Sequence, residues 1–350
     1  MGATYAVRTR LAGRVGMTVA VFFVLGAVAT ALLTGLALRV AQRKGWVDTP
    51  VDRSMHTYAT PTGGGVAIVC VVTAALALWI DLFPIVVAAL AVAIMGFIDD
   101  LRPLPVVPRL IVQGAAIAVG LHSLDALPTL AGFGLTFEPN WIALLILGVA
   151  CLWHLNLFNF MDGIDGIAAA ETTFIGVVAA WLVAERGELS ALWAVIGGAG
   201  VGFWLWNRAP ARIFMGDAGS GFLGFVIAIV LVHSVAQGAL SMSGAVILVS
   251  PFLCDATVTL LRRMVRGEAW YRPHLMHAYQ RLARRWQSHT RVVVALTALN
   301  LAIVLPAALA AEATPDAAPY IAGAVLGLIS ALVAWAGAGR AADLSAPGNP

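Results

Sequence analysis

The sequence predicts an all-helical, polytopic integral membrane protein, and its composition is the first observation that supports this fold class. Hydrophobic residues make up 61% of the 350 residues, whereas Asp, Glu, Lys and Arg together make up only 11%. Soluble proteins carry about 25% charged residues, because they must cover a surface that contacts water. The chain therefore has too little polar material for a soluble fold. With a formal net charge of only +3, it is not expected to bind nucleic acid.

The second observation is a series of apolar runs that approach the length of a membrane-spanning helix, which needs about 20 residues. Cutting the chain where charges or Pro/Gly clusters interrupt these runs predicts eleven transmembrane helices. They cover residues 17–39, 64–83, 84–98, 110–124, 141–160, 167–184, 190–207, 220–237, 242–261, 291–311 and 319–339. The first run is too long for the apolar part of a cleaved signal peptide. We expect a single transmembrane domain over residues 1–350, with one large polar loop at 262–291 and two C-terminal spans within 291–339.

The third observation is the uneven distribution of basic residues, which predicts the orientation. With eleven spans, successive loops alternate between the two sides of the membrane, and 17 of the 21 Lys and Arg residues fall on one side. That side carries the loops at residues 39–63, 99–109, 160–167, 207–219 and 262–291, together with the C-terminal tail. Basic residues are enriched in cytoplasmic loops. This side is therefore predicted to be cytoplasmic, with the N-terminus outside and the C-terminus inside.

Acidic motifs gather on the same predicted cytoplasmic side. Asp99 and Asp100 end the third span, a polar run at residues 156–166 ends the fifth, and Asp217 begins the eighth. A charged group at the centre of a membrane helix costs about 2.5–3.5 kcal/mol, so acids this close to apolar spans are rarely without a function. Taken alone, the Asp-Asp pair also fits a solvated helix end, and Asp217 also fits a helix N-cap.

The run at residues 156–166 is harder to explain as structural, because two amides, two acids and two glycines interrupt an apolar stretch. Its acids, Asp162 and Asp165, are three residues apart. A helix would place both on one face, whereas Gly163 and Gly166 fit a broken turn equally well. The loop at 262–291 adds two histidines and most of the arginines on the same side.

Carboxylates, amides, histidines and arginines in this combination predict a magnesium and diphosphate site. Magnesium prefers oxygen ligands and usually takes one or two protein carboxylates, leaving its other positions to water and substrate phosphates. Arginine and histidine neutralise phosphate oxygens, and glycine lets the backbone approach an anion. The residues concerned are Asp99, Asp100, Asn156, Asn159, Asp162, Asp165, Asp217, His274 and His277.

Together these motifs resemble those of the polyprenyl-phosphate N-acetylhexosamine-1-phosphate transferase family. The family includes phospho-N-acetylmuramoyl-pentapeptide transferase and the enzymes that start O-antigen, enterobacterial common antigen and teichoic acid synthesis. The resemblance runs from about residue 36 to about residue 290, with the motifs in the family's order. They are the segment 48–65, the pair at 99–100, the run 156–166, the segment 214–217 and the histidine loop. The segments 255–263 and 273–280 are most similar to the branch that uses UDP-N-acetylhexosamines for surface polysaccharides.

The resemblance implies a magnesium-dependent reaction, with manganese as a substitute. The phosphate of a polyprenyl phosphate, such as undecaprenyl phosphate, would attack the β-phosphate of a UDP-N-acetylhexosamine and release UMP. By motif position, Asp217 would be the main metal ligand, with help from Asn159 and Asp100. Asp99 would deprotonate or orient the lipid phosphate, and Asp162 would support the site.

The remaining roles that the resemblance implies concern the substrates. Phe214 would stack on uracil, with Gly216 and Asp165 nearby, and Asn156 is a further candidate for substrate binding. The diphosphate or the sugar would be contacted by His274, His277 and Arg272. Weaker candidates for closing the site are Arg53 and His56.

Two features depart from the family pattern or lack an implied role. Relatives often carry a lysine soon after the Asp-Asp pair, but the single lysine here is Lys44, so Arg102 or Arg109 must substitute, and we expect Arg109. Asp255 belongs to the branch signature, and a structural hydrogen bond and a substrate contact fit it equally well.

The sequence therefore predicts a multi-pass enzyme of the bacterial inner membrane, with its active site facing the cytoplasm. Alternatives are a phospho-N-acetylmuramoyl-pentapeptide transferase or a carrier or flippase of lipid-linked sugars. Carriers place ionisable groups near the middle of the bilayer, whereas the acids here cluster at one face. The sequence leaves open the sugar, the polysaccharide pathway, and a one-step or two-step mechanism. A homodimer is compatible with membrane relatives of this kind.

Overall fold

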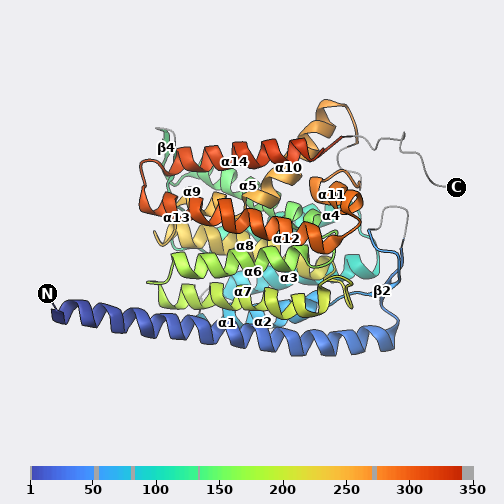
Figure 1. Cartoon of the computed structure of the whole chain (residues 1–350), viewed down its shortest axis with the longest axis horizontal. Helices are drawn as coiled ribbons and strands as arrows, with labels where there is room; N and C mark the ends of the chain where they lie inside the picture. Colours follow the sequence, from blue (N-terminus) through green and yellow to red (C-terminus); the bar gives the residue numbers. More distant parts are fainter. Residues whose placement is uncertain (1, 51–54, 80–82, 133–134, 270–273, 341–350) are drawn as a thin grey trace.

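The computed structural model describes residues 2–50, 55–79, 83–132, 135–269 and 274–340, and it is a mainly helical bundle (Figure 1). The helices are α1 (Gly2–Lys44), α2 (Gly65–Trp79), α3 (Phe83–Leu101), α4 (Val106–His122), α5 (Trp141–Met161), α6 (Ile167–Leu182), α7 (Gly187–Asn207), α8 (Asp217–Ala236), α9 (Met242–Leu248), α10 (Ser250–Val265), α11 (Ala278–Trp286), α12 (His289–Leu299), the π-helix η1 (Asn300–Val304), α13 (Leu305–Ala313) and α14 (Ala318–Trp335).

The bundle confirms a polytopic membrane protein, but it does not establish eleven spans. Among the described residues, seven helices are long and apolar enough to cross a membrane, or eight if the bent pair α9–α10 counts as one span. Three shorter apolar helices, α2, α4 and α6, lie at the other positions where the sequence predicts spans. Each predicted segment therefore contains a helix, while the number that crosses the bilayer stays a prediction.

Two small antiparallel ribbons were not predicted by the all-helical interpretation, and they mark opposite ends of the bundle. One pairs β1 (Val47–Asp48) with β2 (Thr60–Pro61), and the other pairs β3 (Leu130–Gly132) with β4 (Leu135–Phe137). Figure 1 shows β2 and α11 at one end and β4 at the other. The loops assigned to one side by their basic residues thus meet at one end of the bundle.

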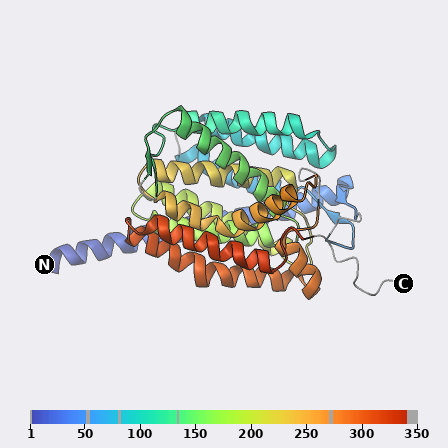
Figure 2. The same cartoon turned by 90° about the horizontal axis from the view of Figure 1, so that it is seen from above.

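The first helix is longer than the predicted span at 17–39. It runs continuously over α1, and its N-terminal part projects beyond the rest of the molecule (Figure 2). Its contact with α7 is made at small residues, because a Cβ at Gly202 would collide with the backbone oxygen of Ala27. Close backbone approach at glycine is a common way for membrane helices to pack.

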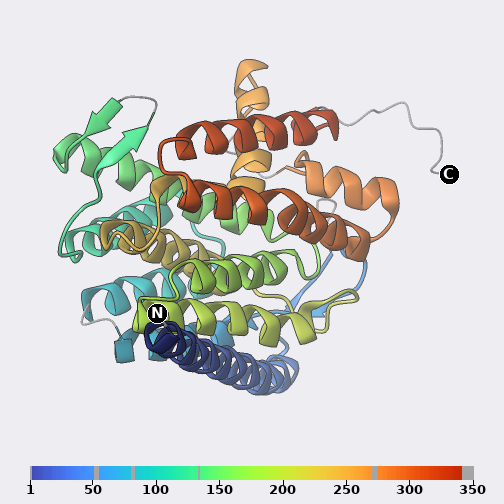
Figure 3. The ribbon, with the colours of Figure 1, turned by 60° about the vertical axis from the view of Figure 1, so that its left-hand side comes forward.

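The predicted ninth span, 242–261, is broken rather than straight. Helices α9 and α10 meet at an angle of 71° around Val249. Pro251 at the start of α10 has no N–H to donate to the preceding turn, which explains a break at this position. Figure 3 shows α10 running across α14 instead of alongside it.

Glycine contacts between α2, α3 and α8 bring three sequence motifs to one place. A Cβ at Gly96 of α3 would collide with the backbone oxygen of Asp217 at the start of α8. A Cβ at Gly65 of α2 would likewise collide with the Cα of Gly219. Because these positions carry no side chain, the end of α3 and the start of α2 lie directly on the first turn of α8.

Candidate functional site

A cavity of about 500 Å³ opens at the end of the bundle that carries β2 and α11. Nine of the predicted site residues line it: His56, Asp100, Asn159, Asp162, Asp165, Phe214, Gly216, Asp217 and His274. Four others do not line it: Asp99, Asn156, Arg109 and His277. Arg53 and Arg272 lie outside the described residues. The cavity thus gathers residues from α3, α5, α8, the β1–β2 segment and the loop before α11.

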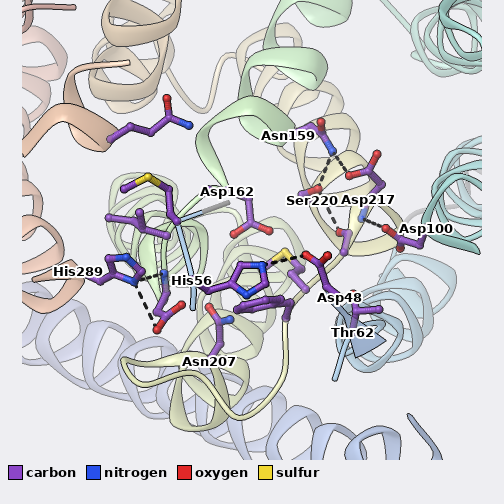
Figure 4. A pocket seen from close by; sticks show the side chains of 18 of the residues that line it. Asp48, His56, Thr62, Asp100, Asn159, Asp162, Asn207, Asp217, Ser220 and His289 are labelled. Atoms are coloured by element: carbon purple, nitrogen blue, oxygen red, sulfur yellow. Dashed lines mark hydrogen bonds and ion pairs between the residues drawn. The ribbon is translucent and has the colours of Figure 1, made fainter. Parts of the chain in front are cut away.

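Asp217, the first residue of α8, is held by an amide from α5. Nδ2 of Asn159 donates to Oδ1 of Asp217 and to Oγ of Ser220, at 2.9 Å in each case (Figure 4). The Ser220 hydroxyl donates in turn to the Gly216 carbonyl at 3.1 Å. This arrangement fixes the Asp217 carboxylate at the positive N-terminal end of a helix, where a negative charge is stabilised.

Asp100 caps the same helix from α3. Its Oδ1 accepts a hydrogen bond from the Asp217 backbone N–H at 2.8 Å, and its Oδ2 accepts one from Ala218 at 3.2 Å. Two of the unpaired amides at the start of α8 are therefore satisfied by an acid from another helix. The structure gives Asp100 a clear structural task, and its role as a metal ligand stays a prediction.

Gly216 makes this cap sterically feasible. Its φ is +75° and its ψ is 169°, a region that residues with a side chain rarely adopt. A Cβ at this position would lie 2.5 Å from Oδ2 of Asp100. The glycine is therefore required by both its backbone angle and the closeness of the Asp100 carboxylate.

Asp99 lies behind the cavity wall and pairs with Arg109 of α4. Nη1 of Arg109 is 2.7 Å from Oδ2 of Asp99, and its Nη2 is 3.8 Å from Oδ2 of Asp217. The other Asp99 oxygen accepts the Leu104 backbone N–H at 2.6 Å. Arg109 thus links the Asp-Asp motif to Asp217, and it lies beside the pair after which relatives often carry a lysine. The structure shows no such link for Arg102.

Asp162 terminates α5 and faces the middle of the cavity. Figure 4 shows its carboxylate between the Asn159–Asp217 pair and His56, without a hydrogen bond or ion pair to the other residues drawn. Burial raises the pKa of Asp162 well above its ordinary value, and the negative charges of Asp217 and Asp100 raise it further. An unpaired acid beside two others favours a positively charged guest.

Asp165 does not continue α5, because the chain turns at residues 162–166 and α6 starts at Ile167. The broken turn is therefore correct, and a helix carrying both acids is not. Oδ2 of Asp165 accepts the Ala211 backbone N–H at 3.0 Å and lies 3.4 Å from Nδ1 of His289.

Phe214 and His56 form an aromatic part of the wall. Their ring centroids are 4.8 Å apart in an edge-to-face arrangement. The Phe214 backbone N–H donates to Pro61 at 2.8 Å, and its carbonyl accepts from Gly64 at 2.9 Å. Nε2 of His56 lies 3.4 Å from Asp48. The segment around β2 therefore holds both rings at the cavity.

His274 lines the cavity, whereas His277 lies behind it. The two rings are 4.8 Å apart. Burial lowers the pKa of His274 to about 3, and the neighbouring His277 and Arg263 lower it further. His274 is therefore neutral near pH 7 and can exchange hydrogen bonds with a substrate without adding charge. His277 is 2% exposed, and its Nδ1 lies 3.6 Å from Oδ1 of Asp255, so in this structure it contacts the base of the histidine segment and not the cavity.

Asp255 caps α11, which answers the question that the sequence left open. Its Oδ1 accepts the Ala278 backbone N–H at 2.8 Å, and its Oδ2 accepts that of Tyr279 at 3.0 Å. Thr259 also donates to Oδ1 at 3.2 Å. With both oxygens engaged by α11 and α10, Asp255 makes structural hydrogen bonds that hold the histidine segment.

Asn156 is directed away from the cavity. Its Nδ2 donates to Gln113 of α4 and to the Leu152 carbonyl, both at 2.9 Å. The prediction of a substrate-binding role is therefore not supported, because α5 directs Asn159 toward α8 and Asn156 toward α4.

Comparisons with known proteins agree with the motifs. Residues 82–235 match glycosyl transferase family 4. Over 311 residues the chain is 28% identical to a probable undecaprenyl-phosphate N-acetylglucosaminyl 1-phosphate transferase of Bacillus subtilis, covering 85% of this chain and 86% of that protein. The chain belongs to the polyprenyl-phosphate N-acetylhexosamine-1-phosphate transferase superfamily.

Two further relatives show the breadth of the superfamily. The chain is 28% identical over 308 residues to decaprenyl-phosphate N-acetylglucosaminephosphotransferase of Mycobacterium tuberculosis, covering 77% of this chain and 76% of the relative. It is 29% identical over 224 residues to phospho-N-acetylmuramoyl-pentapeptide-transferase of Acetivibrio thermocellus, covering 57% and 66% respectively. The resemblance seen in the motifs is thus confirmed, and this chain is a phosphosugar transferase.

The transferase cavity includes polar residues that the sequence did not single out as site residues: Asp48, Thr62, Asn207, Ser220, Gln280 and His289. Asn207 ends α7 and donates to the Ile213 carbonyl at 3.0 Å, while its Oδ1 accepts the Gly166 N–H at 2.9 Å. Its position at the polar end of an apolar span is a signal that could have identified it. His289 has the same signal, because it begins α12.

The side chains of the transferase cavity suit a magnesium ion that substrate phosphates also bind. Among the described residues, no group of three or more His, Cys, Asp or Glu side chains is arranged to hold a metal ion. A magnesium ion that bridges substrate phosphates needs only one or two protein carboxylates. Asp217 and the unpaired Asp162 supply that number, with the Asn159 amide oxygen beside them. The residues therefore suit a metal that arrives with a diphosphate.

We expect Asp255→Asn to lower both the stability and the transferase activity of the protein. The amide places a donor where two backbone N–H groups require acceptors, which costs about 1–3 kcal/mol for each donor left unpaired. The unfolding midpoint in detergent and the transfer rate measure the two effects.

Glu312→Gln is the matched control for this substitution. Glu312 accepts the backbone N–H and hydroxyl of Ser241 at 3.0 and 2.6 Å, next to α9 and away from the cavity. It should lower the unfolding midpoint similarly but leave the transfer rate of the folded protein unchanged. Equal losses of transfer rate in both variants would contradict the proposed link between Asp255 and the histidine segment.

Proposed function

We propose that this transferase moves N-acetylhexosamine 1-phosphate from a UDP-N-acetylhexosamine to undecaprenyl phosphate, releases UMP, and so starts O-antigen or another cell-surface polysaccharide. The observation that carries the proposal is the meeting of Asp217, Asn159 and Asp162 with the Phe214 ring in one cavity. Clustered acids suit a magnesium diphosphate, and an aromatic face suits a nucleobase. Both parts of a nucleotide sugar thus find complementary groups.

In the proposed reaction, an oxygen of the lipid phosphate forms a bond to the β-phosphorus of the UDP-sugar. The bond from that phosphorus to the bridging oxygen breaks, and UMP leaves with the electron pair. Magnesium, held by Asp217 with Asn159 and Asp162, would supply positive charge to the diphosphate. A phosphate monoester has a second pKa of about 6 and is mostly dianionic at pH 7. The lipid nucleophile therefore needs orientation more than deprotonation.

That requirement assigns Asp99 an orienting role. Its carboxylate is paired with Arg109 at 2.7 Å, and Arg109 extends toward Asp217. We propose that Arg109 binds the lipid phosphate and that Asp99 holds the guanidinium in place. A direct displacement is simpler than a covalent aspartyl intermediate, because the Asp100 carboxylate is engaged by two backbone amides.

The proposal includes the membrane arrangement. The protein forms one domain with eleven spans in the bacterial inner membrane, its N-terminus outside and its C-terminus in the cytoplasm. The cavity then faces the cytoplasm, where nucleotide sugars occur, and the lipid enters from the inner leaflet. A homodimer belongs to the same proposal. The uneven distribution of basic residues supports this orientation.

Two other functions compete with the proposal. The similarity to phospho-N-acetylmuramoyl-pentapeptide-transferases favours a peptidoglycan precursor as the donor. A carrier or flippase of lipid-linked sugars would place its ionisable groups near the middle of the bilayer. Its acids would then lie deep within the helices, whereas the cavity acids here lie at helix ends.

The deciding experiment supplies purified protein with undecaprenyl phosphate, magnesium and a panel of UDP-sugars. The panel contains UDP-N-acetylglucosamine, UDP-N-acetylfucosamine, UDP-N-acetylquinovosamine and UDP-N-acetylmuramoyl-pentapeptide, and the readout is released UMP. We expect release with at least one UDP-N-acetylhexosamine and none with the pentapeptide donor. Release with the pentapeptide donor alone would assign the protein to peptidoglycan synthesis. No release with any donor, from folded protein, would reject the transfer reaction.

A further inference from the structure

Glu171 and Asn300 form an isolated polar pair in the apolar interior, away from the cavity. Glu171 lies in the second turn of α6, and Asn300 is the first residue of the π-helix η1. Their exposed fractions are 0% and 1%. Burying an ionised carboxylate costs several kcal/mol unless its charge is compensated. A buried acid at this depth therefore needs a partner that neutralises it.

One hydrogen bond joins the two side chains, and, within the part of the chain that the structure describes, one oxygen atom of each side chain has no partner. Nδ2 of Asn300 donates to Oε2 of Glu171 at 2.7 Å. Among the described residues, no partner reaches the other two polar atoms, Oε1 of Glu171 and Oδ1 of Asn300. Both are acceptors in an ionised pair, and each unpaired buried acceptor costs about 1–3 kcal/mol.

A single proton shared between the two unpaired oxygens would give both of them a hydrogen-bond partner. A carboxylic acid and a primary amide are planar groups that each present a donor beside an acceptor. We propose that Glu171 is held as the neutral acid and that its Oε1–H donates to Oδ1 of Asn300. Together with the observed bond to Oε2, this closes a ring of two hydrogen bonds. The pair then carries no charge and leaves no donor unused at the interface of the two groups.

A bound cation explains the pair less well than a proton. Calcium takes six to eight oxygen ligands, and magnesium requires near-octahedral coordination. The pair provides only two unpaired oxygens. The remaining positions would have to be filled by water in an apolar interior, where water needs several polar partners of its own.

The pair joins the same two elements that meet at the cavity. Helix α6 begins directly after the turn that carries Asp165, and α12 begins with His289, whose Nδ1 lies 3.4 Å from Asp165. The continuation of α12 through η1 brings Asn300 to α6. A π-turn adds a residue to the helix and is frequent near functional sites. Glu171 and Asn300 are therefore positioning residues for the Asp165–His289 contact.

Infrared spectroscopy of the purified protein tests the proton directly. We expect the spectrum at pH 7 to contain the carbonyl band of a protonated carboxylic acid that is absent from Glu171→Gln. This measurement requires no catalytic activity, so its result does not depend on the proposed function. Carboxylate bands as the only difference between the two spectra would overturn the proposal.

Variants of the pair provide a second test. Glu171→Gln retains an acceptor and a donor, so its unfolding midpoint in detergent should match that of the unaltered protein. Asn300→Leu removes both partners of the acid and should lower the midpoint by several degrees. Adding Glu171→Met to Asn300→Leu should recover much of the loss, because an apolar pair leaves nothing unpaired. A strong loss in Glu171→Gln would show that the charge is needed. If sodium, potassium or magnesium raised the unfolding midpoint of the unaltered protein but not that of Glu171→Gln, a bound cation rather than a proton would compensate the charge of Glu171.

The positioning role has its own readout, which rests on the proposed function. In Asn300→Leu, the KM for the UDP-sugar should rise by about threefold to tenfold, the range carried by coupling through packed elements. The kcat should change little, because the cavity acids stay in place. Glu171→Gln should behave as the unaltered protein. A change in kcat alone would separate the pair from Asp165 and overturn the positioning role.

Discussion

Asp217→Asn is expected to lower kcat for UMP release by about 10³-fold, at the upper end of what one electrostatic group contributes in an active site. The substitution removes the negative charge that accepts the Asn159 amide at 2.9 Å and lies 3.8 Å from Arg109, while keeping the size of the side chain. A neutral amide binds magnesium more weakly than a carboxylate does, so the dependence on magnesium concentration should also shift to higher values. UMP release at a series of magnesium concentrations measures both effects.

Asp125→Asn serves as the control for this substitution, because Asp125 is exposed in the connection between α4 and the β3–β4 ribbon, and Figure 1 shows β4 at the end opposite β2 and α11. It should leave the kcat and the magnesium dependence unchanged. If Asp217→Asn keeps more than a tenth of the normal kcat at every magnesium concentration, Asp217 is not the main metal ligand, and Asp162 becomes the stronger candidate.

Gly216→Ala is expected to abolish most activity and to destabilise the protein. A side chain at this positive φ costs about 1–3 kcal/mol, and its Cβ would lie 2.5 Å from the Asp100 carboxylate. Asp100 would then lose its bonds to the first turn of α8, and the Asp217 carboxylate would move. The unfolding midpoint in detergent and the transfer rate report the two consequences.

Gly238→Ala separates the two causes. Gly238 also has a positive φ, of 61°, but a Cβ there has no atom within 4 Å. It should show a moderate loss of stability and no loss of transfer rate. Equal effects of both substitutions on stability and activity would show that backbone strain, rather than the contact with Asp100, explains the need for Gly216.

The sequence predicts which motifs meet in space, because one simple rule governs where they lie. Successive apolar runs cross a membrane in opposite directions, so motifs at the end of the third run, the end of the fifth and the start of the eighth are expected on the same side. The structure brings these ends to one cavity. The preference for Arg109 over Arg102 rests on its place at the start of the next span, and the structure brings Arg109 to 2.7 Å from Asp99.

The sequence could not assign tasks among neighbouring acids, since these depend on tertiary contacts. Asp100 and Asp255 both sit in helices that approach the N-terminus of a different helix, and each accepts two backbone amides there. Neither approach can be read from a single sequence. Asn156 and Asn159 differ for the same reason, because only the structure shows that α4 flanks one and α8 the other.

The break between α9 and α10 was missed for a different reason. The run at 242–261 is apolar throughout its middle, and a proline inside a membrane helix does not always end it. Arg262 of α10 donates to the Ala334 and Ala338 carbonyls at 3.1 and 2.8 Å, and these partners, which hold α10 in its direction, lie far away in the sequence.

The glycine contacts of α2 and α3 with α8 have a practical consequence for redesign of the enzyme. On that side the backbones touch at Gly65 and Gly96, so a larger side chain at either would force the helices apart, and one at Gly216 would displace the Asp100 carboxylate. The opposite wall, by contrast, is attached through the Asp255 cap at the start of α11 and meets the cavity through side chains, among them Leu275 and Gln280. Libraries that seek new donor sugars should therefore vary residues 274–289 and leave the glycine side untouched.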